Sequence, residues 1–292
     1  MKSLWSIFAL ILLFSGNSRG AKLEGSQYNH PDRGPPAELF TAAASLPVSA
    51  IQAAAATASA VPKDATYRIN MYSSTKSNIH TDWTSFKEGA ALSWVADMDV
   101  DCDGINDKCD GNPDGQPQTN WGALSAYAVP YIVIPDRYLA ANKVLLPGNN
   151  IAAVICNGQM YYGILGDSNG DSPQITGEAS WLMAKTCFPN ERLKGDNAHS
   201  ADDVTYIVFT GKDAVLPDSA LNENYITNFD TLRSMGNKLS EALASNLGTR
   251  PTQTTTSTGT KTPDSAASST LVSHTEVTAI LPMIWAILMI LL

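Results

Sequence analysis

The chain has 292 residues, with 19 Lys and Arg against 28 Asp and Glu, so its formal net charge at pH 7 is −9. This length suits one sizeable domain with appendages. The acidic balance argues against binding to nucleic acid and suits a cationic ligand. An acidic surface that only keeps an exported protein soluble is the other explanation, and the positions of the acidic residues decide between the two.

The N-terminal 20 residues have the pattern of a secretory signal peptide. A basic residue precedes an apolar run at 7–14, and small and polar residues follow it. That run is too short to span a membrane, so we expect residues 1–20 to be removed from an exported protein. Residues 21–62 form a polar and Ala-rich segment. Within it, prolines near the start of 45–59 and beyond its end predict one short helix.

An acidic stretch follows a region of short strands and loops at 67–92. Four aspartates alternate along it: Asp97, Asp99, Asp101 and Asp103. In a strand they would share one face, where like charges are unfavourable unless a cation joins them. That cation is either an ammonium group of a ligand or Ca²⁺. Five residues fit positions 1, 3, 5, 6 and 12 of a calcium loop: Asp99, Asp101, Asp103, Gly104 and Asp110. A solvated acidic loop is the third explanation.

The centre of the chain is rich in strand signals. Apolar runs predict buried strands at four places: 131–134, 152–156, 160–165 and 204–209. Asn157-Gly158 predicts a tight hairpin between the second and third of these strands. Residues 137–146 read as a helical turn or loop. Because strands do not alternate with helices, a parallel sheet is not indicated. Trp121 is either a core residue or a platform for a sugar ring.

Three carboxylates lie close together after the hairpin: Asp167, Asp171 and Glu178. Asp167 is expected just past the second hairpin strand, and a Gly-rich loop separates it from Glu178. Such a pair suits general acid and base work on a glycosidic bond. A calcium loop is the rival interpretation, with Asn169 as a further ligand. However, the glycine that this loop needs at its sixth position is Ser172 here, and a strand precedes it.

Four cysteines in an exported chain predict two disulfides, for which three pairings exist. We favour Cys102–Cys109 and Cys156–Cys187, since the first pair is close in sequence and the second ties the hairpin to the segment after Glu178. The scarcity of histidine and the absence of a Cys-x-x-Cys pair argue against zinc.

The C-terminal part changes character. Apolar residues at three- and four-residue spacing predict an amphipathic helix within 219–250. Residues 251–268 are rich in Ser and Thr and read as a glycosylated stalk. The apolar end of 269–292 is shorter than the ~20 residues that span a bilayer. With small residues before it, it matches the signal for a glycolipid (GPI) anchor, with attachment expected at Ser265.

Seven segments, in this order, resemble the fungal chitosanases of glycoside hydrolase family 75: VADMDVDCDG, GQPQTNW, VPYIVIP, GDSNGD, TGEAS, CFPNE and DDVTYIVFTGKD. The resemblance covers about residues 95–215. It implies an inverting endo-hydrolase of chitosan without a cofactor, with structural calcium as a possible addition. Carried over, the catalytic pair falls on Asp167 and Glu178. The expected substrate-binding residues are Asp97, Asp99, Asp101, Trp121 and Asp171.

These observations predict a mainly β, α+β fold, whose catalytic domain covers residues 63–218. The resemblance implies a small β-barrel of the double-psi kind, with a few peripheral helices. We expect a monomer that acts on chitosan outside the cell. The alternative hypothesis is a calcium-loaded, GPI-anchored binding or adhesion protein of the cell wall that lacks hydrolase activity.

Overall fold

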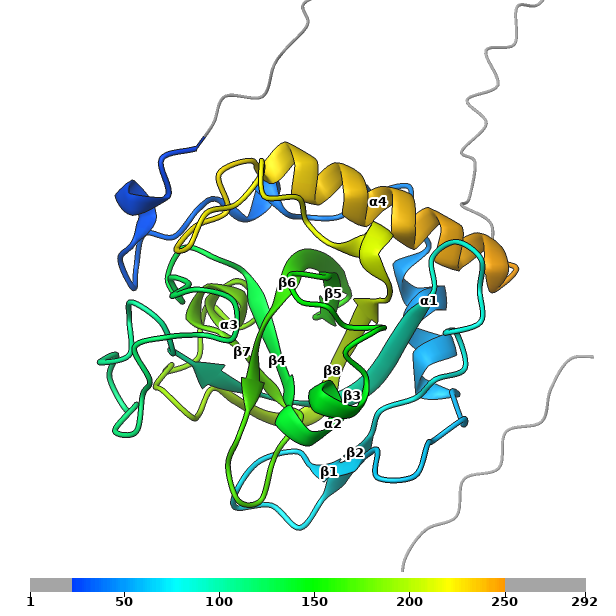
Figure 1. Cartoon of the computed structure of the whole chain (residues 1–292), viewed down its shortest axis with the longest axis horizontal. Coiled ribbons are helices and arrows are strands. Elements are labelled where there is room, and N and C mark those ends of the chain that lie inside the picture. The colour runs from blue at the N-terminus through cyan, green and yellow to red at the C-terminus, as the bar shows by residue number, and fades with distance from the viewer. Residues whose placement is uncertain (1–22, 250–292) are drawn as a thin grey trace, which may run out of the picture. The chain divides into compact units, whose positions relative to one another are not determined.

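The computed structural model describes residues 23–249 (Figure 1). The expected signal peptide, stalk and anchor signal, with Ser265, lie outside the described residues. Within 23–249, no helix has both the length and the apolar character needed to cross a membrane.

Among residues 23–249, the regular elements are eight strands, four α-helices and three short 3₁₀ helices. The strands are β1 (Thr66–Arg68), β2 (Lys76–Asn78), β3 (Ala91–Asp101), β4 (Tyr131–Pro135), β5 (Ile151–Cys156), β6 (Gln159–Asn169), β7 (Glu178–Ser180) and β8 (His199–Phe209). The helices are α1 (Val48–Ala56), α2 (Asp136–Ala141), α3 (Trp181–Cys187) and α4 (Phe229–Asn246). The 3₁₀ helices are η1 (Gly25–Tyr28), η2 (Ala37–Leu39) and η3 (Lys212–Ala214).

Six strands close into a barrel in the order β3-β7-β4-β6-β5-β8, while β1 and β2 form a separate antiparallel pair. Figure 1 shows the helices around the outside of this barrel. The prediction of a mainly β fold with a small barrel and a few peripheral helices is therefore confirmed. The double-psi detail stays a prediction.

The barrel contains both parallel and antiparallel strand pairs. The sequence did not indicate the parallel pairs, because its strands do not alternate with helices. β3 pairs with β7 in parallel, and β4 pairs with β6 in parallel, while the other pairs are antiparallel. Parallel partners need a long crossover between them. Here the crossovers consist of loops and of other strands rather than of single helices, so the usual sequence signal for a parallel sheet is missing.

The hairpin between β5 and β6 is confirmed. Asn157 and Gly158 both have positive φ, at 48° and 72°, as the tightest hairpin turns require. β6 continues to Asn169, so Asp167 lies inside this strand and not just past it. This position fixes the direction of the Asp167 side chain more firmly than a loop would.

The terminal helices pack on the barrel. α1 contacts β3, and α4 contacts β5 and β6. At the α4 contact, Gly236 lies against the ring of Tyr162, and a Cβ at Gly236 would overlap that ring. The Tyr162 hydroxyl hydrogen-bonds with Asn237 and Ser240. The glycine that weakens this helix intrinsically is therefore the residue that lets it approach the barrel.

Candidate active site

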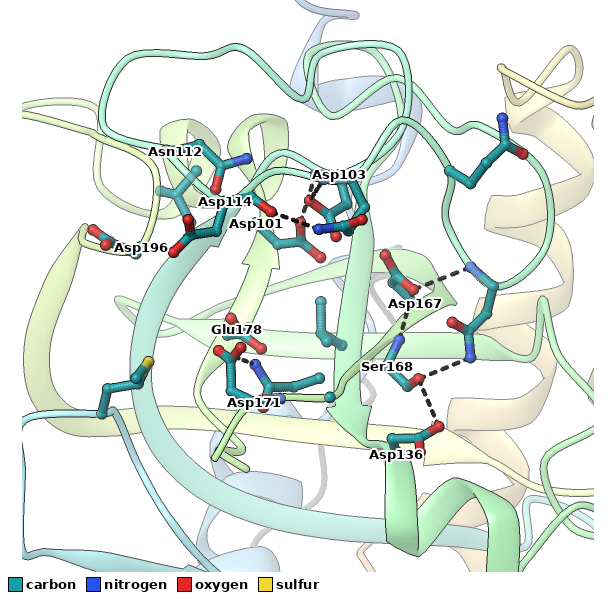
Figure 2. A pocket seen from close by; sticks show the side chains of 18 of the residues that line it. Asp101, Asp103, Asn112, Asp114, Asp136, Asp167, Ser168, Asp171, Glu178 and Asp196 are labelled. Atoms are coloured by element: carbon teal, nitrogen blue, oxygen red, sulfur yellow. Dashed lines mark hydrogen bonds between the residues drawn. The ribbon is translucent and has the colours of Figure 1, made fainter. Parts of the chain in front are cut away.

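An acidic cavity of about 570 Å³ lies where β3, β4 and β6 end and β7 begins. Its lining includes eight acidic residues: Asp101, Asp103, Asp114, Asp136, Asp167, Asp171, Glu178 and Asp196. None of the described residues that line it is basic. Figure 2 shows Glu178 and Asp171 on one side of this cavity in that view and Asp167 on the other. The cavity therefore suits a cationic ligand.

The strand register sets the spacing of the catalytic pair predicted from the sequence. Asp167 in β6 pairs with Val133 in β4. Ile132 in β4 pairs with Ala179 in β7 in the antiparallel sense, and continuing that register places Glu178 opposite Val133. Because neighbouring strands are ~4.8 Å apart, the backbones at Asp167 and Glu178 are separated by about 10 Å. Both side chains line the same cavity, with Val133 between them.

Asp167 is buried, with 4% of its surface exposed. Its Oδ1 accepts hydrogen bonds from the backbone N–H of Ser168 at 2.8 Å and of Asn120 at 3.0 Å. Burial raises the pKa of Asp167 to about 7, and the charge of Asp103 adds to this, while the two N–H groups oppose it. The carboxyl group is thus held in place by donors that favour its charged form, and it titrates near neutral pH.

Glu178 begins β7, where it pairs with Asp99 of β3. Its Oε2 atom is buried and has no hydrogen-bond partner among residues 23–249. Burial raises the pKa of Glu178 well above its ordinary value, and the surrounding carboxylates, with Asp101 first, raise it further. Both effects favour the protonated form, and a protonated carboxyl group can donate to a ligand oxygen.

The acidic loop after β3 closes one side of the cavity. The Cys102–Cys109 disulfide clips this loop, and the Cys156–Cys187 disulfide joins β5 to α3, so both predicted pairings are confirmed. The Asp103 N–H donates to Asp101 Oδ1 at 2.7 Å.

Three carboxyl groups around the cavity can offer oxygens within 4.8 Å of one another, enough to hold a cation: Asp101, Asp103 and Asp167. These three residues come from both calcium-loop patterns of the sequence. Neither pattern folds as one continuous twelve-residue loop, because each includes residues of a strand. Asp99 and Asp101 belong to strand β3, and Asp167 belongs to strand β6. Whether Ca²⁺ binds here stays a prediction.

The other two aspartates of β3 do not line the cavity. Asp97 has no exposed surface, and its Oδ2 accepts a hydrogen bond from Asn70 at 2.6 Å. Asp99 is 6% exposed, and its pKa is raised to about 8 by burial, with contributions from Asp97 and Asp196. The expectation that Asp97 and Asp99 contact the substrate directly is therefore corrected, because both are buried and neither lines the cavity. Of these three aspartates, only Asp101 lines the cavity, while Asp97 and Asp99 lie behind it.

The two remaining predicted residues lie at the edges of the cavity. Asp171 is exposed on the loop after β6, where its Oδ2 accepts from Asn169 Nδ2 at 3.1 Å. Trp121 is half-buried and lines an adjoining depression of about 590 Å³. Asn120 and Asp136 line both spaces, so the depression continues the cavity in the direction of α2.

A hydrogen-bonded chain beside Asp167 was missed in the sequence. Asn120 Nδ2 donates to Ser168 Oγ at 2.8 Å, and Ser168 Oγ donates to Asp136 Oδ1 at 3.3 Å (Figure 2). Asp136 opens α2 directly after β4. An acidic residue in a Pro-Asp pair at the end of a buried strand is the signal that could have marked it.

Comparison with known proteins gives consistent matches. Residues 98–242 match the family model described as fungal chitosanase of glycosyl hydrolase group 75. Endo-chitosanase B of Aspergillus oryzae is 42% identical over 189 residues, which cover 55% of this chain and 78% of that protein. The chain belongs to this chitosanase family.

Two further fungal chitosanases extend the comparison. Endo-chitosanase C of Aspergillus oryzae is 67% identical over 247 residues, which cover 85% of this chain. The match spans 65% of the length of that relative. The endo-chitosanase of Aspergillus fumigatus is 38% identical over 161 residues, which cover 49% of this chain and 66% of that protein. The acidic cavity lies within the region that matches the family model, apart from Met71 at its rim.

Proposed function

We propose that this chain is an endo-chitosanase that hydrolyses β-1,4 glucosaminyl linkages in chitosan. One observation carries the proposal: Asp167 and Glu178 line one acidic cavity from strands that stand two positions apart in the barrel. Chitosan is a polycation in its protonated form, so a lining with eight acidic residues and no basic one among the described residues complements it. The relatives found by comparison are endo-chitosanases, which does not favour the alternative of a binding protein without hydrolase activity.

We propose a single displacement with inversion. Glu178, kept protonated by its surroundings, donates its proton to the glycosidic oxygen as the bond to the anomeric carbon breaks. Asp167, held by two backbone N–H groups, accepts a proton from a water that attacks that carbon from the other side. Inverting pairs keep their carboxyl groups ~6.5–9.5 Å apart to leave room for this water. Backbones about 10 Å apart are compatible with that gap.

This chemistry uses the carboxyl groups of the chain and needs no cofactor. The test of the function is a reducing-end assay on chitosan with and without a calcium chelator. We expect hydrolysis in both samples. If hydrolysis is lost with chelator and returns with Ca²⁺, the cluster of Asp101, Asp103 and Asp167 is a metal site. The absence of hydrolysis under all conditions would contradict the proposal.

We propose that Asp101, Asp171 and Trp121 bind substrate around the catalytic pair. Trp121→Ala should raise KM several-fold with little change in kcat, because a stacking contact away from the reacting bond stabilises ground state and transition state alike. Steady-state kinetics on chitosan oligomers of increasing length are the measurement. Equal KM values for variant and parent on long oligomers would remove Trp121 from the substrate path.

We also propose that the protein is exported, monomeric and held at the cell surface by a GPI anchor, on the sequence pattern of residues 1–20 and 251–292. A phospholipase specific for inositol-linked anchors should release it from intact cells. Detection of peptide 279–292 in the mature protein would contradict the anchor. A molar mass from light scattering tests the monomer.

A further inference from the structure

A second large groove lies on the other side of α2 from the acidic cavity. It has a volume of about 940 Å³ and is lined by parts of β1, β2, α2 and the 173–174 segment. Four basic side chains line it: Lys63, Arg68, Lys76 and Arg137. Asp64 is the one acidic residue among its described lining residues. A groove with a surplus of three positive charges is unusual in a chain whose formal net charge is −9.

These cations are not neutralised by the protein itself. All four are exposed, and within residues 23–249 none of them forms a salt bridge. Arg68 of β1 pairs directly with Lys76 of β2 in the antiparallel register. Like charges directly opposite one another across two strands are destabilising, and a bound anion between them removes the repulsion. The register therefore places two donors where they can share one anionic group.

Two buried tyrosines lie beneath the groove. Tyr138 is 4% exposed and lines the groove, and its hydroxyl has no hydrogen-bond partner within residues 23–249. Tyr67 lies beside it, and its hydroxyl is close enough to Arg137 for the guanidinium charge to oppose the rise in pKa that burial gives to Tyr67.

We propose that this groove binds an anionic polysaccharide through its carboxylate groups. Its volume far exceeds that of one small oxyanion, since a single water occupies ~30 Å³. Alanine and proline side chains between the cations offer apolar contact to sugar rings: Ala140, Ala141, Pro62 and Pro173. The arginines offer the planar donor pairs that match a carboxylate.

The basic groove lies next to the acidic cavity, so one protein can bind a polyanion and a polycation side by side. Asp136 and Arg137 are neighbours at the start of α2, yet Asp136 lines the acidic cavity and Arg137 lines the basic groove. A polycation such as chitosan associates with polyanions by simple charge attraction. A protein with an acidic cavity and a basic groove can bind the polyanion in the groove while the polycation lies in the cavity. Binding in the groove is nevertheless independent of the proposed hydrolysis and is tested separately from it.

The test measures binding of an oligouronate of about ten sugars by calorimetry at low salt, with a neutral glucan oligomer of equal length beside it. We expect the oligouronate to bind and the glucan not to bind. The double variant Lys63→Glu/Lys76→Glu should weaken oligouronate binding at least tenfold, and added salt should weaken it in the parent.

A second double variant controls for overall charge. Lys212→Glu/Lys238→Glu makes the same change of charge at exposed residues outside the groove, and it should bind the oligouronate as the parent does. Thermal unfolding midpoints establish that each variant is folded. Inorganic phosphate serves as a further probe. Equal losses in both double variants, no oligouronate binding, or binding of phosphate with none of oligouronate would each overturn the proposal.

Discussion

Replacing Glu178 by glutamine should lower kcat for chitosan hydrolysis by at least ~10²-fold, which is the usual contribution of a general acid. Glutamine keeps the size of the side chain but cannot supply a proton to the leaving oxygen. The neighbouring negative charges that raise the pKa of Glu178 do not act on an uncharged amide, so the fold is expected to remain intact. Rates on chitosan oligomers and thermal unfolding midpoints are the measurements.

Asp167→Asn should cost at least the same factor, because an amide cannot accept the proton of the attacking water. The matched control is Asp171→Asn, the same change of side chain on an exposed residue of the same cavity. It should lower kcat much less, since Asp171 is not held by backbone donors within the barrel. If Asp171→Asn loses activity and Asp167→Asn does not, the roles of the two aspartates are exchanged.

The configuration of the product tests the single displacement separately from the choice of residues. Two carboxyl groups with room for a water between them give an inverted anomer, whereas a pair ~5 Å apart retains it. Nuclear magnetic resonance spectra recorded during the first turnovers identify the anomer that appears. A retained anomer from an enzyme that still depends on Glu178 and Asp167 would contradict inversion and leave the pair in place.

The parts of the fold that were predicted from the sequence are those with local signals. Asn157-Gly158 fixes the β5–β6 hairpin because few residues tolerate positive φ at two successive positions. The spacing of apolar residues at three and four positions predicted α4, because these residues lie on one face of a helix. Both disulfides were predicted correctly. The first was predicted from the closeness of its cysteines in the chain, and the second because it links the hairpin to the segment after Glu178.

The features that were not predicted from the sequence depend on which strands become neighbours in the barrel. The three-residue strand β7 carries Glu178, and it is too short to show any period in the sequence. Its parallel pairing with β3 places Asp99 opposite Glu178, and Asp99 is buried. The alternation of the aspartates predicted that they share one face, but it does not show that another strand covers Asp99. Asp136 becomes part of the site because β4 ends beside β6, and its Pro-Asp pair does not by itself indicate which strand lies next to it.

The pH dependence of hydrolysis should show an acid limb near the pKa of Asp167, which is about 7 in the free protein. Asp167 must be ionised to act as a base, so kcat/KM should fall about tenfold per pH unit as the pH drops below that value. Glu178 must be protonated to act as an acid, and its raised pKa places the alkaline limb at higher pH.

Bound substrate should move the acid limb. The ammonium groups of chitosan favour the charged form of Asp167, so its pKa falls in the complex and kcat should hold to lower pH than kcat/KM does. Asp103→Asn should move the kcat/KM limb in the same direction, because the charge of Asp103 helps to raise the pKa of Asp167.

Profiles from pH 4 to 9, with the amino groups of the substrate titrated separately, measure both shifts. A kcat/KM that stays constant between pH 5 and 7 would contradict the assignment of Asp167 as the base. So would a limb that moves to higher pH in Asp103→Asn, because removing a negative charge beside a carboxyl group can only make that group easier to ionise.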